Sequence, residues 1–179
     1  KLRASQGAPR RREAIALLRG ALERESAKDA FHLESVWELL SQLKDTQMEQ
    51  ATQSRPQDGG RTTQLAALEA AFAPHVPLVR AARARLTRDH EAADPGTVVS
   101  ACAAEEGGGE CLLDAAAPAQ VAVFFKTAGE LALLAQDYAF GAELLHEALR
   151  TFALVQGFDC SSLVEGCHSL LQIADANRG

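Results

Sequence analysis

The cysteines and histidines of this chain are its most reactive side chains, and their spacing indicates whether they could bind a metal or act as nucleophiles. The four cysteines, at positions 102, 111, 160 and 167, include no Cys-x-x-Cys pair and have no spacing typical of a zinc site. Cys167 and His168 are adjacent, but neighbouring residues of a helix point about 100° apart and do not face each other. We therefore expect free structural thiols, no metal site and a reducing, intracellular location, cytoplasmic or nuclear.

Acid–base chemistry and phosphate binding have only weak candidates in the sequence. Asp137, Glu143 and Glu147 could pair as general acid and base, but three acidic residues on one solvated helix face are far more common than a catalytic pair. His146 stands alone and is typical of a surface or core position. The run Gly107–Gly109 lacks the Lys-Ser/Thr and the strand that accompany a phosphate-binding loop. The sequence therefore predicts no catalytic residue.

The composition indicates the fold class. The chain has 179 residues, enough for one domain with its own core, and 47% of them are hydrophobic while only 5% are aromatic. Alanine is frequent and β-branched residues are scarce, which favours an all-α fold. No stretch reaches the roughly 18–20 apolar residues of a membrane span. Because the sequence starts at Lys1 rather than Met, we expect a piece of a longer or processed protein.

Charge is distributed unevenly along the chain, although the net charge is only −6. Residues 1–90 carry fifteen Lys and Arg against eleven Asp and Glu, whereas residues 91–179 carry three against thirteen. The acidic half disfavours binding to a polyanion. The basic half has few aromatic residues between its charges, which argues against nucleic acid as a partner.

Apolar residues recur at three- and four-residue intervals along most of the chain, and this pattern predicts amphipathic helices. The predicted helices start at residue 10 after a frayed lead-in and then cover 31–43, 62–72, 78–90, 119–135, 138–155 and 162–176. Pro77 suits the first turn of the fourth of these helices. Ser162 and Glu165 form a capping-box pattern at the start of the last helix.

Two segments rich in glycine, proline and polar residues divide the chain. Residues 1–92 are expected to form helix hairpins with a linker at about 50–61, where Pro56 and two glycines follow a polar run. Residues 93–118 are predicted to be a disordered, low-complexity insertion. Residues 119–179 then form a C-terminal group of helices.

Residues 122–149 resemble a tetratricopeptide repeat. The matching positions are Phe125, Gly129, Tyr138, Gly141 and Ala148. Small residues at the crossing of two antiparallel helices allow close packing, and large residues fill the space beside them. The usual glycine of the turn is Gln136 here. The resemblance implies antiparallel helix hairpins stacked in a short right-handed solenoid.

The C-terminal segment is also similar to the end of the helical domain of the SET- and MYND-containing lysine methyltransferases. The matching residues are Gly157, Ser162, Leu163, Val164, Glu165, Leu170, Leu171, Asp175, Ala176 and Asn177. In that family the helical domain walls or restricts the substrate cleft and does not itself transfer methyl groups. The Asn-His-Ser and Cys-x-Cys-x-x-Cys motifs of the SET domain are not in this sequence. The resemblance implies no cofactor in this segment, S-adenosylmethionine only if a SET domain lies upstream, and docking onto such a domain.

The function that these features predict is binding of a protein or peptide segment. Lys126, Glu130 and Leu133 fall at positions that line the concave groove of tetratricopeptide repeats, so we expect them to contact the partner. Arg80 and Arg83 belong to a basic cluster that binds an acidic partner or an acidic lipid surface, forms a solvated face, or pairs with the acidic half of the chain. The alternative function is a standalone helical-repeat scaffold or adaptor in a larger assembly.

Overall fold

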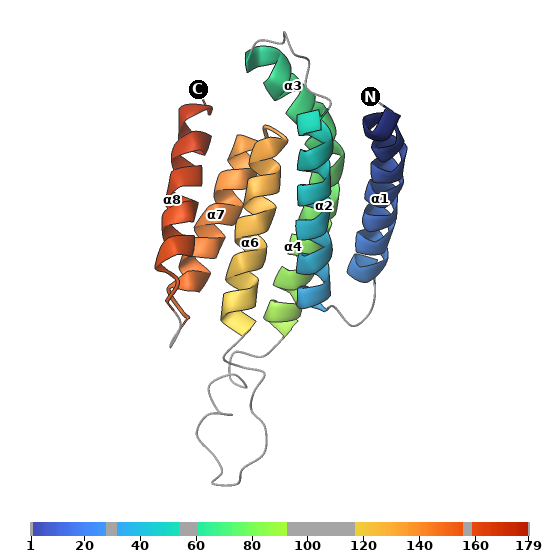
Figure 1. The fold of residues 1–179 in the computed structure, drawn as a ribbon. Coiled ribbons are helices and arrows are strands. Elements are labelled where there is room, and N and C mark those ends of the chain that lie inside the picture. Colours follow the sequence, from blue (N-terminus) through green and yellow to red (C-terminus); the bar gives the residue numbers. More distant parts are fainter. Residues whose placement is uncertain (1, 28–31, 54–60, 93–116, 156–158, 179) are drawn as a thin grey trace.

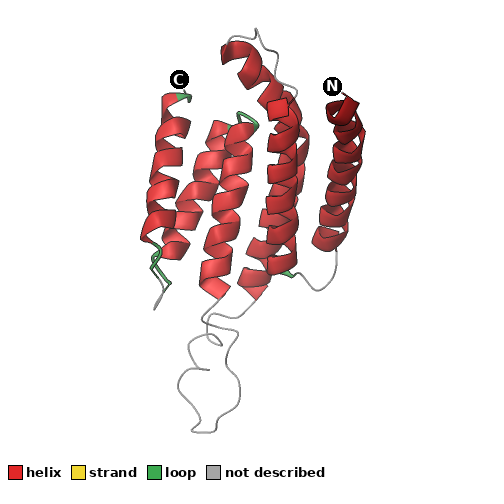
Figure 2. Cartoon of the chain, in the orientation of Figure 1, coloured by secondary structure: helices red, strands yellow, loops and turns green. Residues whose placement is uncertain are grey.

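The computed structural model describes residues 2–27, 32–53, 61–92, 117–155 and 159–178 (Figure 1, Figure 2). The elements are α1 (Leu2–Ala27), α2 (Leu33–Gln53), α3 (Arg61–Phe72), the short 3₁₀ helix η1 (Ala73–His75), α4 (Val76–Ala92), α6 (Ala117–Leu134), α7 (Tyr138–Phe152) and α8 (Ser161–Ala176). No strand occurs among these residues, and the predicted all-α class is confirmed. The right-handed solenoid stays a prediction. None of the described helices has both the length and the apolar composition needed to cross a membrane.

Two helices extend far beyond their predicted ends, whereas the ends of α3, α4, α6 and α7 differ from the predicted ones by three residues at most. Helix α1 begins at Leu2, so the predicted frayed lead-in is wrong; good helix formers there outnumber Gly7 and Pro9. Helix α2 continues to Gln53 and so includes part of the predicted linker. This polar segment packs against the rest of the protein, because Gln47 is buried and Met48 contacts the core. The rest of that linker and most of the predicted insertion, residues 54–60 and 93–116, lie outside the described residues.

The start of α8 differs from the predicted capping box. The helix begins at Ser161, one residue early, and Cys160 at its N-cap makes no side-chain capping bond. Asp159 takes this role instead, because its Oδ1 accepts hydrogen bonds from the backbone N–H of Ser161 at 2.9 Å and from its hydroxyl at 2.6 Å. These bonds lower the pKa of Asp159. Glu165 is exposed and is not part of a cap, so the capping-box prediction is wrong.

The helices pack in two layers (Figure 1). One layer contains α2, α6 and α8, which run in the same direction, and α6 contacts both of the others. Behind it, α4 and α7 run in the opposite direction, while α1 packs against α2 and α4 at one end of the array. The buried face of a helix is therefore covered partly by helices that are distant in sequence, as α2 is by α6 and α1 is by α4.

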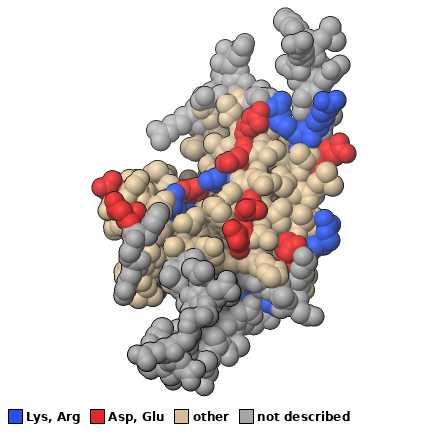
Figure 3. Space-filling view, turned by 60° about the horizontal axis from the view of Figure 1, so that its bottom comes forward, with Lys and Arg blue, Asp and Glu red and all other residues tan. Residues whose placement is uncertain are grey.

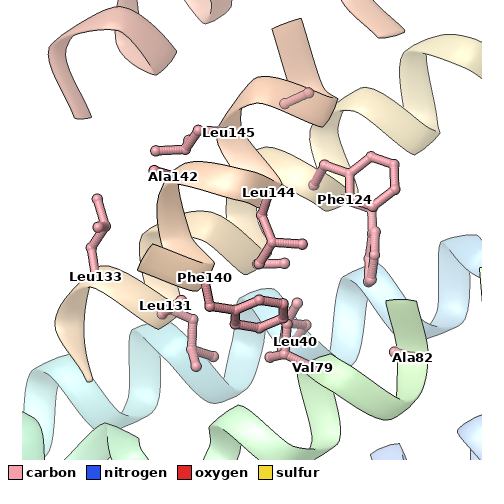
Figure 4. Packing of buried hydrophobic residues seen from close by; sticks show 14 of the residues in the cluster. Leu40, Val79, Ala82, Phe124, Leu131, Leu133, Phe140, Ala142, Leu144 and Leu145 are labelled. Atoms are coloured by element: carbon pink, nitrogen blue, oxygen red, sulfur yellow. The ribbon is translucent and has the colours of Figure 1, made fainter. Parts of the chain in front are cut away.

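The core lies between the two layers and is almost entirely apolar. Its largest fully buried side chains include Leu22, Val36, Leu40, Leu43, Phe72, Val79, Phe124, Leu131, Leu144 and Leu145. Figure 4 shows Phe140 directed from α7 toward Val79 of α4. Full burial of a leucine or phenylalanine side chain contributes about 1.5–3 kcal/mol, so this cluster supplies the main stabilisation of the layers.

A close helix crossing joins α6 to α7, and glycines on both sides make it possible. A Cβ atom on Gly129 would lie 2.9 Å from Cγ of Leu145, and one on Gly141 would lie 2.7 Å from Cδ2 of Leu133. Real Cβ atoms do not approach other atoms so closely. The small residues predicted at these two positions therefore lie where the backbones need them.

Candidate functional site

A groove lies between α2 and α8, with the C-terminal half of α6 as its floor and α3 as one wall. Its volume is about 510 Å³, within the range of about 300–1,000 Å³ that is common for ligand pockets. The apolar side chains that line it are Met48, Leu65, Leu68, Leu133, Leu134, Tyr138, Leu170 and Ile173. The polar ones are Lys44, Asp45, Glu130, Gln136 and Asn177.

Apolar side chains in this groove remain in contact with solvent. Leu65 is 39% exposed and Ile173 is 51% exposed, although both are large hydrophobic residues. The other two exposed large hydrophobic residues among the described ones, Leu17 and Leu154, do not line the groove. The groove therefore has exposed apolar surface on the walls formed by α3 and α8, which is a property of binding sites.

An ion cluster of Lys44, Glu130 and Lys126 lies in the floor of the groove. Nζ of Lys126 pairs with Oε1 of Glu130, and Nζ of Lys44 pairs with Oε2, so both carboxylate oxygens are occupied. All three side chains are about one-fifth exposed, at 19–21%. Burial alone would raise the pKa of Glu130, but the hydrogen bonds and charges of the two lysines outweigh it and lower that pKa.

This cluster ties together the three helices of the layer. Lys44 comes from α2 and Glu130 from α6, while the Lys126 side chain runs along α8. A Cβ atom on Gly166 of α8 would lie 3.3 Å from Cε of Lys126. Beside the cluster, the indole N–H of Trp37 donates to Oγ1 of Thr127 at 3.3 Å. These contacts connect the floor of the groove to α2 and α8.

The turn between α6 and α7 positions the third wall. Gln136 has a φ of 60°, the left-handed conformation in which glycine is favoured. Its Nε2 donates to the backbone oxygen of Leu65 at 2.9 Å, and this bond fastens α3 to the turn. A glycine at this position could not make the bond.

The predicted partner-binding arginines are engaged within the chain. Nη2 of Arg80 lies 2.7 Å from Oδ2 of Asp137, and its guanidinium lies 3.9 Å from the ring centre of Phe140. Arg83 pairs with Glu143 at 3.0 Å and also with Glu147. Burial would lower the pKa of Arg83, but the bonds and charges of both glutamates raise it.

These pairs bear out the alternative in which the basic cluster binds the acidic half of the chain. Arg80 and Arg83 do not line the groove. The three carboxylates considered for acid–base chemistry are the partners of these two arginines. On the face shown in Figure 3, basic and acidic side chains of the described residues are interspersed and neither sign forms a continuous patch.

Of the other predicted contact residues, Glu130 and Leu133 line the groove and Lys126 reaches it through Glu130. The sequence interpretation missed the walls, namely Met48, Leu65, Leu68 and Ile173. The apolar spacing gave no signal for Leu65 and Leu68, because they share a helix face with the buried Phe72.

Two buried titratable groups lie outside the groove lining. His75 is 2% exposed, and neither of its ring nitrogens has a hydrogen-bond partner among the described residues. Burial together with the charge of Arg19 lowers its pKa to about 4. Cys167 is a free thiol whose burial raises its pKa to about 11. Cys160 is also free, and Cys102 and Cys111 lie outside the described residues. The described part of the chain contains no group of three or more potential metal ligands.

Comparison with known proteins adds no relative: no family model, curated protein or solved structure matches this chain.

Proposed function

We propose that this chain is a helical protein–protein interaction module that binds a peptide segment in the groove between α2, α3, α6 and α8. The observation that carries the proposal is a largely apolar groove with Leu65 of α3 and Ile173 of α8 exposed in its walls. Sites of this kind bind apolar side chains and use a few polar groups to orient them. Glu130 and Leu133, expected from the repeat pattern to contact a partner, line the same groove.

The order of the helices supports a role of the tetratricopeptide type. Helices α2, α6 and α8 run in the same direction in one layer (Figure 1), and all three contribute lining residues to the groove. The ion cluster of Lys44, Glu130 and Lys126 holds the floor in one arrangement. A rigid floor lowers the ordering cost of binding, which favours recognition of a segment that is itself flexible.

The more specific proposal is that this module is the C-terminal helical domain of a SET- and MYND-type protein-lysine methyltransferase. It rests on the residues matched in α8 and just before it, and it assigns catalysis and S-adenosylmethionine to another domain. The alternative is a standalone scaffold subunit. Sequencing of the natural transcript upstream of Lys1 separates the two, because only the first version requires a SET domain with its Asn-His-Ser motif.

Selection from a displayed library of random peptides tests the binding proposal. Peptides enriched on the wild-type chain are measured against Ile173→Asp, which places a charge on the apolar wall, and against Leu154→Asp. Leu154 is 70% exposed and lies outside the groove, so the second variant is a matched control. We expect Ile173→Asp to weaken binding by about ten-fold or more, and Leu154→Asp to leave it unchanged.

Two results contradict the proposal. One is a library from which no peptide is enriched. The other is a set of peptides that bind Ile173→Asp as tightly as the wild-type chain. Circular dichroism of each variant checks that its helices are intact, since Ile173 is half-exposed and its replacement leaves the core in place.

A further inference from the structure

The charged side chains at the groove cancel one another. Lys44 and Lys126 share the one carboxylate of Glu130, so this cluster carries one positive charge in excess. Asp45, the next residue on α2, also lines the groove, is exposed and has no hydrogen-bond or ion-pair partner among the described residues. Its negative charge offsets the excess of the cluster. No other charged side chain lines the groove in the part of the chain that the structure describes, so neither sign of partner is favoured.

A charged group that entered the groove would meet both signs there. A partner's ammonium would be attracted to Asp45 and repelled by the excess positive charge of the cluster, and a partner's carboxylate would meet the reverse. Both oxygens of Glu130 are already paired, and the three side chains of the cluster are only 19–21% exposed. An added charge would therefore lose part of its hydration and gain little attraction in return, which is unfavourable.

Two amide side chains that line the groove suit uncharged donors. The NH₂ group of Gln136 donates to the backbone oxygen of Leu65 at 2.9 Å, and that of Asn177 donates to the backbone oxygen of Ile173 at 2.7 Å. Their side-chain carbonyl oxygens accept no hydrogen bond within the described residues. These oxygens can accept a hydrogen bond from a hydroxyl or amide group of a partner without the burial of a charge.

The walls of the groove are helical ridges. On α8 the lining residues Leu170, Ile173 and Asn177 follow one another at three- and four-residue intervals, and on α2 Lys44 and Met48 are four apart. Ridges of this spacing receive the ridges of another helix. An amphipathic helix inserts apolar residues at the same intervals, which suits the apolar floor and walls.

We propose that the partner segment is an amphipathic helix whose groove-facing side is uncharged, with apolar residues in the groove and serine, threonine, asparagine or glutamine side chains at its edges. This inference rests on the proposed function and names its partner class. The apolar residues supply most of the affinity, and the uncharged flanks avoid the cost of placing a charge beside the ion cluster. Charged residues of the segment lie on its opposite side, where they keep their hydration.

Three model peptides test this proposal. Each is about 18 residues long, long enough for a helix in isolation, with leucine at i, i+3, i+4 and i+7 and the same mixture of lysine and glutamate on the side opposite the leucines. The positions on both flanks of the leucine stripe are glutamine in the first peptide, lysine in the second and glutamate in the third. Circular dichroism is used to match the helicity of the three peptides.

Fluorescence anisotropy of the labelled peptides with the full chain gives the dissociation constants. We expect the glutamine peptide to bind at least about three-fold more tightly than either of the other two, because its flanks bring no charge into the groove. Its affinity should change by less than about two-fold between about 0.05 M and about 0.5 M NaCl, since no ion pair with the groove is formed.

Charge variants test the cancellation directly. Lys44→Gln leaves Asp45 without its offset, so the lysine peptide should gain about two- to five-fold relative to the glutamine peptide. Asp45→Asn leaves the positive excess of the cluster, so the glutamate peptide should gain by a similar factor. Glu165→Gln is the matched control, because it removes one negative charge from an exposed position on α8 outside the groove. We expect it to leave the relative affinities of the three peptides unchanged.

The outcomes separate this inference from the proposed function. If the lysine or the glutamate peptide binds as tightly as the glutamine peptide, or if both groove variants leave the relative affinities unchanged, the uncharged partner is wrong and the groove still binds peptides. The inference also fails if Glu165→Gln shifts the relative affinities as far as the groove variants do. If Ile173→Asp leaves the binding of every peptide unchanged, the groove is not the site and both proposals fail.

Discussion

Gly129 and Gly141 face each other where α6 crosses α7, and neither position has room for a methyl group. A Cβ atom on Gly129 would lie 3.2 Å from the backbone oxygen of Gly141, and one on Gly141 would lie 3.3 Å from the backbone oxygen of Gly129. Backbone atoms cannot move aside as a flexible side chain can. The crossing therefore sets the distance between α6, which forms the floor of the groove, and α7 behind it.

Alanine at either glycine of this crossing is expected to destabilise the protein. We expect Gly129→Ala or Gly141→Ala to lower the free energy of unfolding by about 1–3 kcal/mol through overpacking. Gly20→Ala is the control, because its Cβ would meet only the flexible end of Arg24, at 3.3 Å. It should raise the free energy of unfolding by about 0.5–1 kcal/mol through helix propensity. Urea denaturation measures all three, and equal effects at Gly20 and Gly129 would contradict the close crossing.

Loss of the Glu130 carboxylate is expected to loosen α2 from α6. We expect Glu130→Gln to lower the free energy of unfolding at pH 7 by about 1–3 kcal/mol, because Lys44 and Lys126 then lose their shared partner. The fluorescence of Trp37, the one tryptophan of the chain, reports on the α2–α6 contact. Unchanged stability in this variant would show that the cluster contributes nothing.

The pH dependence of this effect has a defined sign. The pKa of Glu130 is lower in the folded than in the unfolded state, so its contribution is present above the unfolded value of about 4.5 and is lost as the pH falls through the folded value. Wild type and Glu130→Gln should therefore converge in stability in strong acid. A difference that persists there would contradict an electrostatic role.

His75 is expected to make the protein sensitive to mild acid. Its pKa is about 4 in the folded state and 6.5 in the unfolded state, so the unfolded chain binds the proton more tightly. Stability is therefore lost as the pH falls from about 6.5 to about 4, by about 3 kcal/mol in total. His75→Leu should remove this loss and His146→Gln, at an exposed site, should retain it. Equal pH profiles for wild type and His75→Leu would contradict burial of a neutral imidazole.

Asp137 has two roles that substitution can separate. Its Oδ1 accepts from the backbone N–H of Phe140 at 3.3 Å and caps α7, while its Oδ2 pairs with Arg80 at 2.7 Å. Asp137→Ala should cost about 1–2 kcal/mol, and Asp137→Ser, which keeps a cap, should cost less than about 0.5 kcal/mol. Thermal or urea unfolding measures both. Equal losses in the two variants would mean that the ion pair, and not the cap, provides the stabilisation.

The C-terminal helices could be predicted from the sequence to within a few residues because their information is local. The apolar intervals of α6 and α7, the Gln136-Asp137 turn and the small residues at 129 and 141 all act within one hairpin. The extension of α2 and the cap at Asp159 were missed for different reasons. Gln47 is polar, so its burial does not follow from the local sequence. Asp159 precedes the Ser162 and Glu165 capping-box pattern, and the sequence does not show which of the two caps the helix.

Of the residues that line the groove, only two on its floor, Glu130 and Leu133, could be predicted from the sequence. Glu130 and Leu133 followed from the resemblance to a tetratricopeptide repeat, whereas the wall formed by Leu65 depends on a hydrogen bond from a residue 71 positions away in sequence. The arginines of α4 show the same limit. Their spacing indicates a basic face, but only the packed structure brings Arg83 to Glu143 and Glu147 of α7.

The most direct test of the central claim is to locate peptide binding on the chain by NMR. A peptide enriched from the displayed library is added to ¹⁵N-labelled protein, and amide shifts are followed across the described helices. We predict that the shifts concentrate at 44–48 in α2, 65–68 in α3, 130–136 at the end of α6 and 170–177 at the end of α8, around the lining residues of the groove. Shifts concentrated on α1 or α4, or none at saturating peptide, would contradict the claim that this groove is the binding site.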